Sequence, residues 1–125
     1  MDELKLKFAA WIERVSLSSP PPSEISVFNV GLFETTSGYT AYLGGFKEYD
    51  SDDDDWACEA DYFPKEKFLE LPQSFVIGKD WESVEAGVVT MIKELLLSTQ
   101  NAGNILTRAT ILTVGFDDGT LIRIK

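Results

Sequence analysis

The sequence predicts an α+β fold in a single domain spanning residues 1–125, with an antiparallel sheet of about five strands and two helices packed against it. Two segments have the apolar spacing of amphipathic helices, whereas several shorter ones are rich in β-branched and aromatic residues. An Asp-Gly pair near the C-terminus indicates a tight hairpin. With 125 residues, of which 44% are hydrophobic, the chain can bury a core of its own.

The N-terminal half predicts a helix followed by a hairpin. Apolar residues recur at helical spacing over residues 3–16, and Asp2 stands where an N-cap would help to start the helix. The three prolines that follow cannot continue this helix, because each lacks an amide donor and restricts the residue before it. Residues 25–33 and 39–46 are then expected as two strands, with turn residues between them.

Two features of the middle of the chain extend the sheet. Gly44 and Gly45 indicate a bulge, a close backbone approach, or a bend that lets the strand run into the next loop. Period-two alternation over residues 56–63 predicts a third strand, in which Glu59 and Asp61 share the more acidic face.

The remaining elements follow from breakers and periodicity. A short helix is expected over residues 64–71, which begin at a proline and precede Pro72. A longer helix over about residues 80–99 is predicted by an apolar stripe that includes Trp81, Val88 and Leu95. We assign Trp81, like Trp11 in the first helix, to the core. Segments 110–116 and 120–124 flank the Asp-Gly turn and should close the sheet.

The charge of the chain is concentrated in residues 48–61, here called the acidic stretch. It holds eight of the 21 acidic residues and no lysine or arginine, so the formal net charge of −10 is mostly local. Consecutive aspartates lose solvation when buried, so we expect the stretch on a solvated surface or against a group that neutralises it. The simpler alternative is a solvated loop that only aids solubility.

Composition excludes several kinds of chemistry. The chain has no histidine, which rules out histidine-dependent triads and HExxH metal sites. Its single cysteine, Cys58, rules out an internal disulfide and cysteine clusters for zinc or iron-sulfur centres, and suits a reducing cytoplasm. The phosphate-binding glycine motifs GxxxxGK and GxGxxG do not occur in the sequence. Adjacent exposed carboxylates share one environment, so they lack the divergent pKa values that general acid-base catalysis needs. We therefore predict a protein that is not an enzyme and needs no cofactor, with a small-ligand or metal-dependent enzyme as the weaker alternative.

The acidic stretch also resembles part of a calcium loop. Asp50, Asp52, Asp54 and Asp61 fall at positions one, three, five and twelve of that template. Position six, however, carries Asp55 where glycine is needed for the sharp turn, and position twelve is an aspartate where a bidentate glutamate is expected. We predict no specific metal site, with weak cation binding as the alternative.

Charge and hydropathy also restrict partner and location. No segment approaches membrane-spanning length and the N-terminus lacks the apolar core of a signal peptide, so we expect a cytoplasmic protein that does not bind membranes. A pI near 4.3 opposes binding to nucleic-acid phosphates and anionic lipids. Basic proteins are the favoured partners, and the sequence does not indicate an oligomeric state.

The segment YDSDDDDWAC at residues 49–58, together with the closing GFDDG turn at 115–119, resembles small acidic immunity proteins of bacterial polymorphic toxin and contact-dependent inhibition systems. The resemblance extends to size, charge and α+β layout. It implies a cytoplasmic protein that binds and neutralises a toxin domain, often a nuclease whose active surface is basic. The charge argument agrees with it, because a focused negative patch accelerates encounter with a positive partner and penalises wrong ones.

On this basis we predict a non-enzymatic inhibitor that covers a basic cleft with charged and aromatic side chains. The alternative is a regulatory or scaffold module whose sheet binds the partner, while the acidic loop serves solubility or weak cation binding. The predicted partner-binding residues are Tyr49, Asp50, Asp52, Asp53, Asp54, Asp55, Trp56, Glu59, Asp61 and Tyr62.

Overall fold

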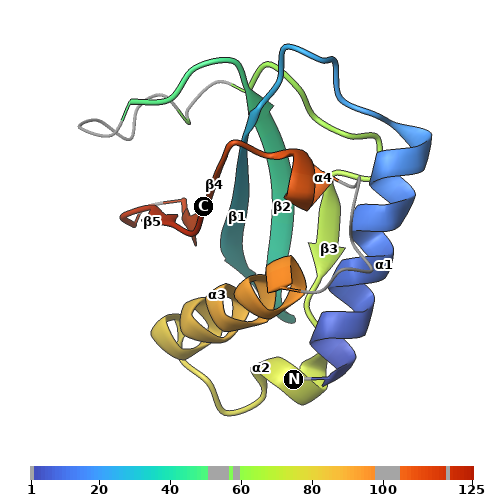
Figure 1. Ribbon diagram of the computed structural model, residues 1–125. Helices are drawn as coiled ribbons and strands as arrows, with labels where there is room; N and C mark the ends of the chain where they lie inside the picture. The colour runs from blue at the N-terminus through green and yellow to red at the C-terminus, as the bar shows by residue number, and fades with distance from the viewer. Residues whose placement is uncertain (1, 51–56, 58–59, 98–104, 118) are drawn as a thin grey trace.

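The computed structural model describes residues 2–50, 57, 60–97, 105–117 and 119–125 (Figure 1). Its elements follow the order α1 (Asp2–Ser18), β1 (Val27–Thr35), β2 (Gly38–Phe46), β3 (Phe68–Glu70), α2 (Gln73–Val76), α3 (Trp81–Leu97), α4 (Ile105–Arg108), β4 (Ile111–Phe116) and β5 (Ile122–Arg123). The α+β class, the N-terminal helix, the longer second helix and both hairpins are therefore confirmed.

The five strands form one mixed sheet in the order β3-β2-β1-β4-β5. The pairs β1·β2 and β4·β5 are antiparallel, as expected, and β2·β3 is antiparallel too, whereas β1 and β4 are parallel, with Val27 opposite Ile111 and Leu32 opposite Phe116. Parallel neighbours need a crossover connection, and the chain between β1 and β4 includes the helices that cover the sheet. The sheet is therefore mixed and not purely antiparallel, because a long crossover that includes these helices joins the parallel strands β1 and β4.

One face of the sheet and both long helices enclose the core. Alternate residues of β1, such as Phe28, Val30 and Leu32, join a single buried cluster with the apolar stripes of α1 and α3. Val88 and Leu95 of α3 are 1% and 5% exposed, which confirms their core assignment. Figure 1 shows α1 and α3 crossing the same face of the sheet, and the opposite face has no long helix over it among the described residues.

Two predictions from the middle of the chain are wrong. Residues 64–71 contain β3 in place of a short helix, because their backbone completes the edge of the sheet: Leu43 N–H donates to the Lys67 carbonyl and Leu71 N–H to the Tyr39 carbonyl. Trp81 is 49% exposed, whereas Trp11 is fully buried. Trp81 opens the first turn of α3, so its place on the apolar stripe does not bring it over the core.

The glycine pair of β2 allows a close approach. The register of β1 and β2 runs without interruption through Gly44 and Gly45, so there is no bulge between these strands. A Cβ at position 45 would lie 2.6 Å from Ile25 Cγ2 and 2.8 Å from Tyr62 Cδ2. Of the predicted strand over 56–63, the described residues contribute one isolated bridge, Tyr62 to Gly45, and the rest lies outside the described residues.

Candidate functional site

The two ends of the acidic stretch are held together at the end of β2. The Lys47 N–H donates to the Asp61 carboxylate at 2.9 Å, and Gly45 pairs with Tyr62 through backbone hydrogen bonds. The two ends of the acidic stretch therefore lie side by side. Asp52, Asp53, Asp54, Asp55, Trp56, Cys58 and Glu59 lie outside the described residues.

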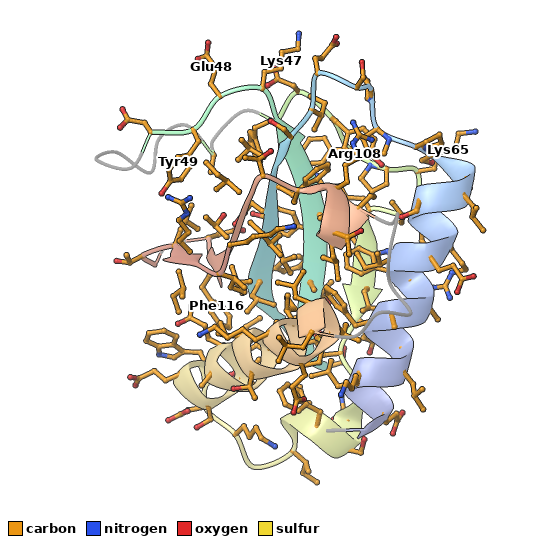
Figure 2. All side chains as sticks on the ribbon, in the orientation of Figure 1. Lys47, Glu48, Tyr49, Lys65, Arg108 and Phe116 are labelled. Carbon is orange, nitrogen blue, oxygen red and sulfur yellow. The ribbon has the colours of Figure 1, made fainter. Side chains whose placement is uncertain are left out.

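The described members of the predicted site have different surroundings. Asp50 and Asp61 are exposed, as the solvated-surface argument requires. Tyr49 is half-buried, and its ring lies 5.4 Å from the Arg123 guanidinium carbon, so the start of the stretch contacts β5 (Figure 2). Their role in binding a partner stays a prediction.

Tyr62 anchors the far end of the stretch to the core. Its ring packs edge-on against Phe28 at 6.4 Å, and its hydroxyl donates to the Ser19 carbonyl. Burial raises the pKa of Tyr62 to about 12, against the smaller opposing effect of the Arg108 charge. The side chain thus fixes where the loop re-enters the sheet.

The face of the sheet that lies away from the helices carries a group of aromatic side chains, here called the aromatic face: Phe33, Tyr42, Phe63 and Phe68. Phe63 and Phe68 are 48% and 53% exposed, which is unusual for phenylalanine. Phe33 lies 5.9 Å from Phe68 and 6.1 Å from Tyr42, so the rings of three strands are in contact. Contiguous exposed apolar patches of this kind are typical of interaction sites.

The aromatic face already holds one cation. The Lys67 ammonium lies 3.8 Å from the ring centroid of Phe63, 5.2 Å from that of Phe68 and 5.7 Å from that of Tyr42. Ring faces are electronegative and attract ammonium or guanidinium groups at such distances. The face is therefore chemically suited to cationic side chains.

Tyr42 lies across the sheet and connects this face to the end of β4. Its ring crosses β1 at Gly31, where a Cβ would come within 2.0 Å of the Tyr42 ring, and its hydroxyl donates to the Asp117 carboxylate. Glycine at position 31 is what permits this path. A hollow of about 350 Å³ beside Tyr42 is lined also by Ala57 and Asp117, so part of the acidic stretch lies along the same face.

A second hollow, here called the end cavity, lies where β1 and β4 end and α3 begins. It has a volume of about 520 Å³ and is lined by Leu32, Phe33, Glu34, Trp81, Phe116, Asp117 and Gly119. Phe116 (labelled in Figure 2) is one of its lining residues, and Trp81 and Tyr39 pack edge-on against the Phe116 ring at 5.7 Å and 5.8 Å. Its lining thus combines aromatic walls with two carboxylates.

Further carboxylates surround the end cavity. Burial and the charges of Glu34 and Asp80 raise the pKa of Tyr39. Burial also raises the pKa of Glu85, where a hydrogen bond from the Phe116 backbone opposes the effect and the charge of Glu82 adds to it. Glu34 and Asp80 therefore lie near Tyr39, and Glu82 lies near Glu85, whose carboxylate is beside the Phe116 backbone.

The acids around the end cavity were not predicted from the sequence as a group. Its members come from β1, from the start of α3 and from the end of β4, and they meet only because β1 and β4 are parallel and end together. Asp117 beside the Asp-Gly turn was a local signal, but nothing in the order of residues connects it with Glu34 or Trp81.

Comparison with known proteins gives no assignment: no protein-family model, no curated protein and no solved structure matches this chain. In the part of the chain that the structure describes, no group of three or more His, Cys, Asp and Glu side chains could hold a metal ion. Within that same part, no helix is both long enough and apolar enough to cross a membrane.

Proposed function

We propose that this chain is a non-enzymatic binding protein that covers and neutralises a basic protein domain, in the manner of an acidic immunity protein acting on a bacterial toxin nuclease. The observation that carries the proposal is the exposed aromatic face, whose Tyr42 hydroxyl donates to the Asp117 carboxylate, in a chain of net charge −10. Aromatic side chains supply contact area, and surrounding acids select a positive partner.

In this proposal each surface has a separate task. The acidic stretch is closed at its base by Asp61 and Tyr62, and Ala57 lies along the same hollow as Tyr42. A basic domain attracted by the aspartates would therefore meet the rings of the aromatic face next. Long-range charge attraction would raise the association rate, and aromatic rings that become buried in the complex would slow dissociation.

The proposal expects a gene for a basic domain beside the gene for this chain, and the test is co-expression of that domain with this chain. We expect the domain alone to arrest growth and this chain to restore it, and we expect the purified pair to associate more slowly as salt is raised. Neutralising residues 52–55 to asparagine should lower the association rate and its salt dependence while leaving thermal unfolding unchanged. Continued toxicity in the presence of well-expressed, folded chain would contradict the proposal.

A second candidate is a scaffold module in which the aromatic face alone binds a partner. The exposure of Phe63 and Phe68 favours it, because these rings offer apolar area independent of charge. The two candidates respond differently to salt: apolar docking persists at an ionic strength that suppresses steering by exposed charge. Phe68→Ala should weaken partner binding under either candidate function. Replacing residues 52–55 by asparagine should weaken partner binding only if the chain is the charge-steered inhibitor.

A further inference from the structure

We infer that the end cavity is a receptor for a single cationic side chain of the partner, an arginine in preference to a lysine. The inference rests on the proposed function, because it identifies the group that a basic partner would insert. The cavity has about 520 Å³, within the range of small-ligand sites and ample for one guanidinium and its alkyl stem.

The lining provides both interactions that a guanidinium makes. Trp81, which is half exposed, and Phe116 present aromatic surface, and carboxylates come from Glu34 of β1 and from Asp117, which directly follows β4. A planar guanidinium stacks on an aromatic ring while it donates to carboxylates at its edge, whereas a lysine ammonium is a compact, strongly hydrated point charge. The arrangement therefore favours arginine.

No internal cation satisfies these groups among the residues described. The lining contains no lysine or arginine, and no salt bridge within the described residues engages Glu34 or Asp117. The nearest basic residue in sequence, Lys79, instead donates to the Phe75 carbonyl and lies 4.7 Å from the Phe75 ring centroid. This contrasts with the aromatic face, whose rings already surround Lys67.

The start of α3 does not offset this negative charge. A helix N-terminus carries partial positive charge, which would oppose a cation. Here Asp80 caps the helix by accepting from the Ser83 N–H at 2.9 Å, and Glu82 follows in the first turn. The field at the cavity therefore remains favourable to a positive group.

The cavity can be tested without any protein partner. The probe is N-acetyl-arginine amide, titrated into the full chain while the Trp81 indole N–H is followed by NMR, with the neutral isostere N-acetyl-citrulline amide as the matched ligand. We expect saturable shifts with the arginine probe, with a dissociation constant on the order of 1 mM or weaker. Glu34→Gln and Asp117→Asn should each weaken binding by roughly twofold to fivefold.

Controls separate the cavity from general charge effects. Glu70→Gln removes an exposed carboxylate of β3, outside the cavity, and should leave the probe affinity unchanged. Asp117→Asn keeps an oxygen that can accept from the Tyr42 hydroxyl, so its fold should be preserved, as checked by thermal unfolding. Equal binding of the citrulline probe, or no saturable shift at the Trp81 indole, would overturn the inference.

The outcome also distinguishes the cavity from the proposed function. If the arginine probe binds but the neighbouring basic domain does not, the proposed function fails and the cavity stands. If that domain binds and its affinity is unchanged by Glu34→Gln and Asp117→Asn together, the cavity assignment fails and the proposed function stands.

Discussion

Replacing Gly31 by alanine should displace the Tyr42 ring from the sheet, because the two cannot occupy the same space. The added Cβ would lie 2.0 Å, 2.2 Å and 2.4 Å from three atoms of the Tyr42 ring and hydroxyl. Tyr42 is only half-buried, so the ring can swing outward, but it then loses its packing over β1 and its hydrogen bond with Asp117. We expect a cost of about 1–3 kcal/mol in the free energy of unfolding.

The reasoning can be separated from a general effect of alanine in a strand by a double-mutant cycle. Alanine restricts the unfolded chain more than glycine does, which by itself favours the folded state by about 0.5–1 kcal/mol. In a Tyr42→Ala background the clash is absent, so Gly31→Ala should be neutral or slightly stabilising. The predicted coupling energy between the two positions is about 2 kcal/mol.

The assay is urea unfolding of the four proteins in the cycle, with thermal unfolding as a second measure. For a chain of 125 residues, 1 kcal/mol corresponds to roughly 4 °C in the unfolding midpoint. Tyr42→Phe, which removes only the hydroxyl, should cost about 0.5–1.5 kcal/mol and isolates the hydrogen bond. Additive effects of Gly31→Ala and Tyr42→Ala would show that Tyr42 does not lie over Gly31.

Three other outcomes test the core, the helix cap and the buried tyrosine. Leu95→Ala should destabilise the fold by about 2–5 kcal/mol in urea unfolding, since the side chain is 5% exposed, and an unchanged midpoint would remove it from the core. The hydrogen bond from the Ser83 N–H lowers the pKa of Asp80, so this helix cap stabilises the fold at neutral pH. The stabilisation is lost as the pH falls through the lowered pKa. Asp80→Ala should therefore lower the thermal unfolding midpoint at pH 7 and have a smaller effect in acid. Burial raises the pKa of Tyr62 from 10.0 to about 12, so its contribution to stability is complete below pH 10 and is lost as the pH rises through 12. Ultraviolet titration should show a tyrosine that ionises at about pH 12, and Tyr62→Phe should abolish that step.

The elements that could be predicted from the sequence are those that depend on local pattern. The α1 and α3 helices follow from apolar stripes, and the β1·β2 and β4·β5 hairpins follow from turn residues between strand-forming segments. In each case the deciding information lies within about 20 residues. The same holds for the core, where Val88 and Leu95 were assigned from their spacing alone and are buried.

The errors have a common origin in contacts between distant segments. A propensity argument placed a helix over residues 64–71, but the free edge of β2 offers hydrogen-bond partners that the segment takes as β3. Likewise, periodicity gives the face of α3 on which Trp81 lies, but not where the sheet beneath it ends. The exposed rings of the aromatic face were not singled out for the same reason, since alternation in β1 and β2 does not reveal which face the helices cover.

Of the candidate site, only the acidic stretch, which is continuous in the sequence, could be predicted. The acidic stretch is visible as a run of residues, whereas the acids of the end cavity come together from Glu34, Asp80, Glu82, Glu85 and Asp117. These two groups hold thirteen of the 21 acidic residues, and the eleven lysines and arginines outnumber the eight acids that remain. The negative charge therefore belongs to two regions of the molecule, and the rest of the chain carries a small positive excess.

This distribution bears on how a basic partner would be oriented. Lys47 follows β2 and Arg108 precedes β4 at one end of the sheet (Figure 2). Glu34 near the end of β1 and Asp117 after β4 lie at the other end. Asp117 and Phe116 line both hollows, so the end cavity continues into the surface beside Tyr42 and Ala57. A positive domain would be attracted by the acidic stretch, whose base at Asp61 lies beside Lys47, and by the end cavity at the opposite end of the sheet, and an arginine in that cavity would fix its position. Charge over two regions can thus define an orientation, which a single acidic loop could not.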